Sequence, residues 1–187
     1  MQCIWLVLLI AVAALAALCP ALAQADEIRA ERLVKTAYLF HFSGLVEWPD
    51  GSFASPDSPL RVGIMGADDI ADELVRMIAS RQLQGRPIIV SKLKPSAPRS
   101  MVHMLFIGDS LREQLPDILD AVKGQPVLTI TQTENALAFG SMINFLSIDG
   151  SLRFEISQQA PAQARLTISS RLLSVSHKFS PGSPKFR

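Results

Sequence analysis

The segment from Gly140 to Ile156 restricts the fold of this chain more strongly than any other part of the sequence. At its centre lies Asp149-Gly150, a dipeptide suited to the left-handed φ angles of a two-residue hairpin turn. Counting outward from this turn places Phe145 opposite Phe154, and because side chains alternate along a strand, one face of the hairpin is apolar. The side chains on that face are Ile143, Phe145, Leu152, Phe154 and Ile156. The sequence therefore predicts a hairpin with one core face and one charged face.

The first 23 residues are typical of an export signal. An apolar run from Ile4 to Leu18 leads through Pro20 to Ala21-Leu22-Ala23, a small-x-small cleavage pattern. The run is short for a membrane span, so cleavage and release into the periplasm are favoured over a retained anchor. Cys19 follows the large Leu18, which argues against a lipid-modified cysteine. Cleavage removes 23 of the 187 residues and leaves 164, enough chain for one domain with a sizeable core.

Cysteine and charge content narrow the class of protein. Cys3 and Cys19 both precede the cleavage site, so the exported chain is expected to have no disulfide and no thiol chemistry. The 18 Lys and Arg residues and the 17 Asp and Glu residues all follow residue 23, so the net charge stays near +1. A chain so close to neutrality is not expected to bind nucleic acid.

Apolar runs and helical periodicity alternate through the rest of the chain. Four runs are expected to form strands: Leu60–Met65, Ile88–Leu93, Met101–Ile107 and Val127–Thr131. Helices are expected at Glu27–Val46, after Asp68 or Asp69, and from Ser110 to Gly124. This alternation predicts an α/β fold, a single domain with a mostly parallel sheet flanked by helices and a C-terminal β-hairpin. The domain is expected to span residues 24–176, with residues 177–187 as a flexible tail.

Polar residues that follow the strands have two interpretations. Asp68, Asp69 and Asp109 could gather at the carboxyl edge of the sheet as a phosphoacceptor site. The same residues are suited to cap the following helices, and Ser110-x-x-Glu113 has the form of a capping box. Capping is the favoured interpretation, because an exported protein meets no ATP and therefore no phosphodonor.

No group of residues in the sequence forms a recognisable catalytic site. His41, His103 and His177 are scattered, without the spacing of metal ligands. Gly140-Ser141-Met142 does not continue into a nucleophile elbow, and Gly63-Ile64-Met65-Gly66 lacks the lysine of a phosphate loop. We therefore predict no catalytic residue, no metal and no cofactor.

Several short segments, in matching order between Ile28 and Val175, carry a family resemblance. They are Thr36–Phe42 with Val46–Pro49, Arg61–Gly66, Gly85–Ile88, His103–Ile107, Phe139–Phe145, Arg153–Ile156 and Ile168–Leu173. These segments resemble those of the YfiR family of periplasmic proteins. The resemblance implies an α/β periplasmic protein, often a homodimer, that represses an inner-membrane diguanylate cyclase by binding its periplasmic sensor region. Loss of such a repressor raises cyclic-di-GMP and promotes biofilm formation.

One departure limits this resemblance. Family members often carry a cysteine just before the position of His103, where this chain has Val102. Control through disulfides is therefore not expected here.

The first of two binding hypotheses concerns the C-terminal β surface. The cyclase is expected to contact Arg153 and Glu155 on the charged face of the hairpin, together with Leu166 and Ile168 nearby. Alternatively, Arg153 and Glu155 only pair with each other across a solvated face, a contact worth at most about 1 kcal/mol.

In the second hypothesis the chain is a periplasmic small-molecule-binding domain that feeds another membrane sensor. Its candidate ligand pocket lies at the carboxyl ends of the strands, with Trp48, Asp68 and Asp109 as lining residues. Trp48 has an alternative role as a hydrophobic plug at the end of a helix.

Overall fold

The computed structural model describes residues 24, 26–79, 86–96 and 102–180. Its strands are β1 (Val46–Glu47), β2 (Leu60–Met65), β3 (Ile88–Leu93), β4 (Met104–Ile107), β5 (Leu128–Thr131), β6 (Ile143–Ile148), β7 (Ser151–Ser157), β8 (Thr167–Ile168) and β9 (Lys178–Ser180). Its helices are the first helix (residues 26–43), α2 (Asp68–Ile78), η1 (Asp109–Gln114), α3 (Leu115–Asp120), η2 (Ala136–Phe139), α4 (Gln159–Gln163) and α5 (Ser170–Ser174). The expected export signal and the last seven residues of the expected tail lie outside the described residues.

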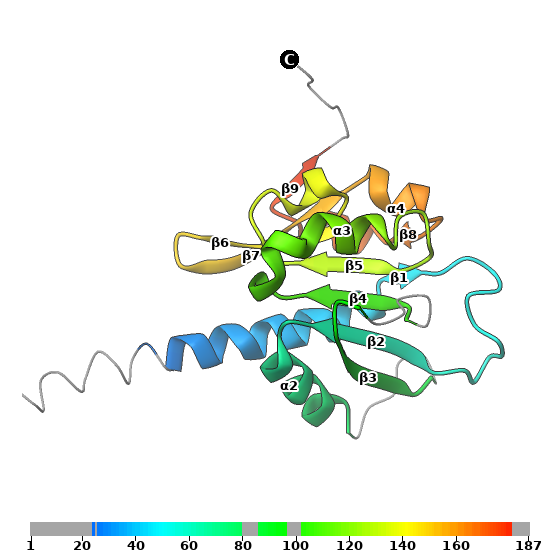
Figure 1. The fold of residues 1–187 in the computed structure, drawn as a ribbon, viewed down its shortest axis with the longest axis horizontal. Coiled ribbons are helices and arrows are strands. Elements are labelled where there is room, and N and C mark those ends of the chain that lie inside the picture. The colour runs from blue at the N-terminus through cyan, green and yellow to red at the C-terminus, as the bar shows by residue number, and fades with distance from the viewer. Residues whose placement is uncertain (1–23, 25, 80–85, 97–101, 181–187) are drawn as a thin grey trace, which may run out of the picture.

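Seven strands form one sheet in the order β3-β2-β4-β5-β6-β7-β9 (Figure 1). Neighbouring strands in this sheet are parallel except for the β6–β7 hairpin. β1 and β8 form a separate antiparallel pair. The predicted fold class, an α/β single domain with a mostly parallel sheet and a C-terminal hairpin, is confirmed.

The hairpin has the register that its turn dipeptide predicts. Phe145 pairs with Phe154, and both turn residues are left-handed, with φ of 50° at Asp149 and 70° at Gly150. Two left-handed residues give the turn whose twist matches that of the flanking strands. A slip by one residue would turn the apolar side chains to the other face, so the turn and the core specify the same pairing.

Helices cover both faces of the sheet. On one face, the first helix and α2 contribute Leu39 and Leu74 to a cluster of buried residues that includes Ile64 of β2. On the other face, Ile118 of α3 lies in a second cluster with Leu105 of β4. Figure 1 shows α3 in front of the sheet and the first helix passing behind it. The strands between them are buried on both faces, as expected for parallel strands.

Aromatic side chains fix the hairpin to the first helix. The ring of Phe154 lies edge-on to Phe42 at 5.0 Å and to Tyr38 at 5.4 Å, measured between ring centroids. Phe145 stacks on Phe42 at 5.8 Å. Each such pair contributes about 0.5–1.5 kcal/mol beyond the burial of apolar area. The apolar face of the hairpin is therefore anchored, while its other face points away from this core.

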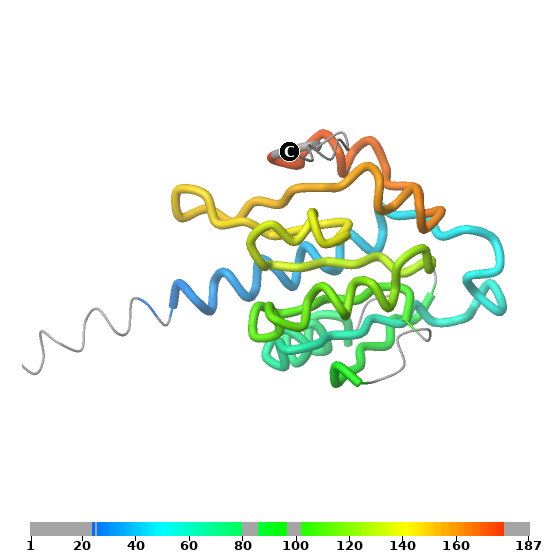
Figure 2. The backbone as a smooth tube through the Cα atoms, turned by 45° about the horizontal axis from the view of Figure 1, so that its top comes forward, coloured from blue at the N-terminus to red at the C-terminus, as the bar shows by residue number. Residues whose placement is uncertain are grey.

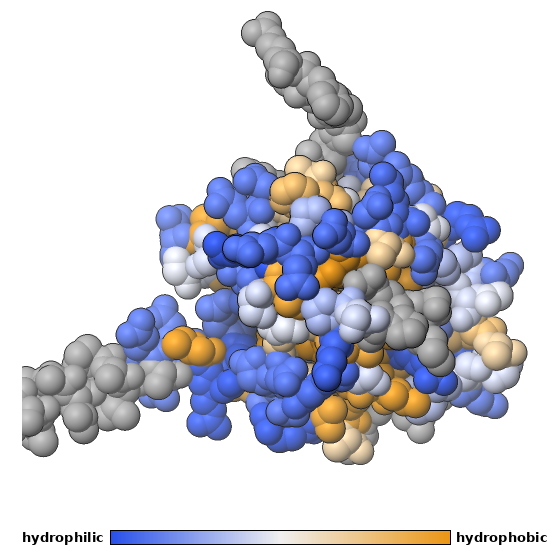
Figure 3. Space-filling view, viewed as in Figure 1, coloured by the Kyte–Doolittle hydropathy of each residue, from blue (hydrophilic) through white to orange (hydrophobic). Residues whose placement is uncertain are grey.

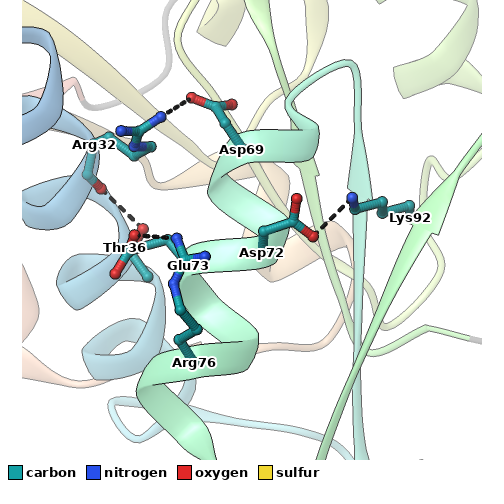
Figure 4. A network of polar contacts seen from close by, with 7 residues as sticks. All are labelled: Arg32, Thr36, Asp69, Asp72, Glu73, Arg76 and Lys92. Carbon is teal, nitrogen blue, oxygen red and sulfur yellow. Dashed lines mark hydrogen bonds and ion pairs between the residues drawn. The ribbon is translucent and has the colours of Figure 1, made fainter. Parts of the chain in front are cut away.

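Ion pairs tie α2 to its neighbours at the surface (Figure 4). Arg32 of the first helix lies 3.2 Å from Asp69, and Lys92 of β3 lies 2.7 Å from Asp72. Pairs as exposed as these are worth at most about 1 kcal/mol each, so apolar packing holds the helix in place.

The structure corrects several expected boundaries. The helix expected from Ser110 to Gly124 is the 3-10 helix η1 followed by α3, which ends at Asp120. The first helix ends at residue 43 rather than at Val46, because Val46 pairs with Ile168 in the β1–β8 ladder. β4 begins at Met104, three residues later than expected. Lys178–Ser180 pairs with β7 as β9, so the expectation of a flexible tail from residue 177 is wrong for these three residues.

Candidate functional site

The face of the hairpin opposite the aromatic core carries a buried polar network. Thr131 and Asn144 are both 0 % exposed, and the Thr131 hydroxyl donates to Asn144 Oδ1 at 2.8 Å. Ser141, also fully buried, lies 2.9 Å from the same hydroxyl and supplies a second polar contact. Asn144 Nδ2 then donates to Glu155 Oε1 at 3.1 Å. A half-buried surface carboxylate is thus held by an amide that the core itself fixes.

Glu155 does not pair with Arg153 as the sequence suggested. Among the described residues, no ion pair joins Arg153 to Glu155. The Glu155 carboxylate instead accepts a hydrogen bond from Asn144. The reason is geometric, because Asn144 lies directly opposite Glu155 in the β6–β7 ladder. Arg153 and Glu155 nevertheless share one face with Ser157, since the three alternate along β7.

A cavity of about 280 Å³ lies beside this face, between α3, η2 and α4. Phe139 and Ser157 both line it, and Phe139 is 50 % exposed. Ser157 lies two residues along β7 from Glu155, so the half-exposed Phe139 adds apolar area to the same side of the hairpin as the fixed carboxylate. We call Arg153, Glu155, Ser157 and Phe139 the hairpin face. Phe139 was not predicted as a site residue, and the signal that Gly140 gives is only the end of the helix that carries Phe139.

Leu166 and Ile168 do not lie on the hairpin face, so the expectation that they adjoin Arg153 and Glu155 is wrong. Leu166 is 5 % exposed and belongs to the core cluster on the opposite face of the sheet, and Ile168 packs against the same cluster. Leu166 has too little exposed area for a contact surface because it fills the core. A partner contact at Arg153, Glu155 or Ile168 stays a prediction.

The carboxyl edge of the sheet brings together part of the predicted pocket. Asp109 accepts a hydrogen bond from Thr133 at 3.1 Å and lies 2.5 Å from Arg112. With Asp69 and Ser110, it lines a cavity of about 180 Å³ that also includes Arg32 and Lys35 of the first helix. Asp68 does not line this cavity. Trp48, Asp68 and Asp109, the three residues predicted to line a ligand pocket, therefore do not form one pocket.

Neither predicted cap is formed at this edge. α2 has Ala67 at its N-cap, and Asp68 lies in its first turn without a capping hydrogen bond. Ser110 donates instead to the carbonyl oxygen of Gly66, at 2.8 Å. This bond ties the loop after β4 to the loop after β2, a tertiary contact that replaces the local capping box.

Trp48 lies at the other end of the sheet. Its Nε1 donates to the carbonyl oxygen of His103, which precedes β4, at 3.2 Å. The connection from Trp48 to β2, cyan in Figure 2, lies at the end of the molecule opposite the hairpin tip. Trp48 packs against the core, in agreement with the alternative role as a plug.

Metal and membrane sites are not seen in the described part of the chain. There, no three His, Cys, Asp or Glu side chains are grouped to hold a metal ion. No helix within the described ranges combines the length and the apolar character needed to cross a bilayer. Over the face that carries α3, hydrophilic side chains dominate and apolar ones occur in small groups (Figure 3).

Comparison with known proteins identifies the family. The profile of the YfiR/HmsC-like family matches residues 32–177, which include most of the first helix, the hairpin and β8. No curated protein matches the chain. The match covers well over half of the sequence, and the chain therefore belongs to the YfiR/HmsC-like family.

Proposed function

We propose that this protein is a periplasmic repressor of an inner-membrane diguanylate cyclase, which binds the periplasmic sensor region of the cyclase and lowers cyclic-di-GMP and biofilm formation. Membership of the YfiR/HmsC-like family supports this function. The observation that carries it to particular residues is the hydrogen bond from buried Asn144 to Glu155. A carboxylate held in one orientation loses little conformational freedom when a cationic partner binds, which favours recognition.

Repression needs no chemical step in this proposal. The repressor binds the inactive conformation of the cyclase more tightly than the active one and so shifts the population toward the inactive state. An envelope signal that removes the repressor restores cyclase activity. The hairpin face supplies the contact, with Glu155 for a basic group on the sensor region and Phe139 for an apolar one.

The test combines two measurements in cells that lack the wild-type gene. A tagged chain is purified from solubilised membranes to identify bound proteins, and cyclic-di-GMP is measured in the same cells. Glu155→Lys is expected to weaken both co-purification of the cyclase and repression. Asp57→Lys is the matched control, because Asp57 is exposed in the connection at the opposite end of the molecule. A folded Glu155→Lys chain that binds and represses like the control would refute the assigned contact.

A second candidate function is suggested by one observation at the carboxyl edge. Arg32 Nε is buried without a hydrogen-bond partner among the described residues, and Arg32 lines the cavity of about 180 Å³ there. A small carboxylic acid would satisfy this donor, and the domain would then feed a membrane sensor as a ligand-binding module. A thermal-shift screen of small periplasmic acids is expected to stabilise the protein if this is so. Absence of any stabilisation would exclude the second candidate.

A further inference from the structure

The connection between β1 and β2, residues 48–59, packs over the amino-terminal ends of β2, β3 and β4. The ring of Phe53 stacks on His103 with centroids 4.3 Å apart and planes at 17°. The guanidinium carbon of Arg86, just before β3, lies 4.1 Å from the centroid of the same Phe53 ring. Phe53 is therefore held between an imidazole and a guanidinium group. The ring of Trp48 lies edge-on to the ring of His103, with the two centroids 6.4 Å apart.

The hydrogen bonds of His103 allow one protonation state of its ring. Nδ1 accepts from the backbone N–H of Arg61 at 3.0 Å, so this nitrogen carries no proton. Nε2 lies 2.9 Å from the carbonyl oxygen of Ser52, which can only accept, so this nitrogen carries the proton. The contacts thus define a neutral imidazole with its hydrogen on Nε2. A second proton, on Nδ1, would place one N–H group against the backbone N–H group of Arg61.

We propose that His103 is an acid-sensitive latch, whose protonation releases residues 49–59 from the amino-terminal end of the sheet. The ring cannot keep both hydrogen bonds once both nitrogens are donors. If it swings away from the Arg61 N–H, it moves out of line with Ser52 and loses its stacking on Phe53. The three contacts that His103 makes to the connection and to β2 therefore fail together.

The positive charges around His103 also disfavour the protonated form of its ring. Burial lowers the pKa of His103 below its usual value, and the nearby cations Arg61 of β2 and Arg86 before β3 lower it further. The hydrogen bond to Ser52 opposes this shift, since a charged ring donates more strongly. The connection itself faces the ring with a carbonyl group and with Phe53 and Trp48, which carry no charge.

The sign of the pH effect follows from this lowered pKa. The neutral form of His103 contributes stability at pH values above about 6.5, the ordinary value for histidine. That contribution is lost as the pH falls from there through the lowered pKa of the folded state, because the released or unfolded chain binds the proton more tightly.

Release is expected to be local rather than global. Directly beneath this connection, Leu60 and Met104 are each 1 % exposed and belong to the main core cluster. By contrast, Arg86 donates to the carbonyl oxygens of Ser55 and Ser58 in the connection, both at 3.0 Å, and the first of these bonds is exposed and the second only partly buried. Segments with few buried contacts open at a lower free energy than the whole domain. The proton therefore opens the connection before it unfolds the sheet.

The test follows three signals in the protein as purified, from pH 7.5 to pH 4.5. Nuclear magnetic resonance reports the titration of the His103 ring and hydrogen exchange of the Arg61 amide, which Nδ1 protects. Trp48 fluorescence reports the stack, and Trp48→Phe checks that the signal comes from Trp48. We expect all three to change together below pH 6.5, while far-ultraviolet circular dichroism stays constant. His103→Gln is expected to remove the transition, since glutamine does not titrate.

The two remaining histidines provide matched controls, so His41→Gln and His177→Gln are expected to leave the transition unchanged. Protection of the Arg61 amide that persists while the His103 ring titrates would overturn the latch. This measurement uses the wild-type protein, so it does not depend on whether any variant folds. Loss of circular dichroism in the same transition would overturn it as well, because the event would then be global unfolding.

Discussion

Asn144→Ala tests whether the buried network holds the hairpin face in place. Asn144 is 0 % exposed, accepts from Thr131 at 2.8 Å and donates to Glu155 at 3.1 Å. The bond between neutral groups is worth about 1 kcal/mol, and the bond to the half-buried carboxylate about 1.5 kcal/mol. Loss of the carboxamide also leaves a small void that adds up to about 1 kcal/mol. We expect the free energy of unfolding to fall by about 3 kcal/mol, and the melting temperature by about 6–12 °C.

Equilibrium unfolding in urea measures this change, provided that the slope m is the same in both proteins. Ser147→Ala is the control, because Ser147 is exposed on the same strand and its replacement is expected to cost less than about 0.5 kcal/mol. A double-mutant cycle with Glu155→Ala isolates the bond to the carboxylate, with an expected coupling of about 1.5 kcal/mol. A loss below about 1 kcal/mol for Asn144→Ala at unchanged m would refute the argument that this network orders the face.

Three further changes test other parts of the structure. Gly108→Ala places a Cβ atom 2.2 Å from the carbonyl oxygen of Gly66, so two backbones must separate, and chemical unfolding is expected to show a loss of about 2–3 kcal/mol. Phe154→Ala removes a ring that is 2 % exposed and contacts Phe42, and the same assay is expected to show a loss of about 3–5 kcal/mol. Between pH 7.5 and pH 5.5, hydrogen exchange in the wild type is expected to show falling protection around His103, with no such fall in His103→Gln.

Features that depend on local sequence were the most predictable. The pairing of Phe145 with Phe154 follows from a two-residue turn and from alternation, and both are short-range rules. The apolar runs that became β2 and β3 have the same bounds in the structure as in the prediction. In these segments the local preference and the tertiary packing favour the same conformation.

Features set by distant contacts were not predictable from the same rules. Ser110 has the sequence context of a cap, but the close approach of Gly66 offers its hydroxyl a tertiary acceptor. β1 and β8 are two residues long, too short for any periodic signal, and the ladder between them joins residues that are about 120 positions apart. Arg153 was one possible partner for Glu155 along the strand, whereas the observed partner, Asn144, comes from the strand opposite.

The proposed repression sets a free-energy requirement for the hairpin face. To move a cyclase from 99 % active to 99 % inactive, a repressor must bind the inactive state about 10⁴-fold more tightly, a difference of about 5.5 kcal/mol. In this proposal, a hydrogen bond from the cyclase to the Glu155 carboxylate contributes about 1.5–3 kcal/mol of this difference, and full burial of the exposed half of Phe139 contributes about 1 kcal/mol or more. Neither contact is sufficient alone, so Glu155→Lys and Phe139→Ala are each expected to leave partial repression. The double variant is expected to raise cyclic-di-GMP to the level of the deletion strain, and full repression by that folded double variant would place the contact elsewhere.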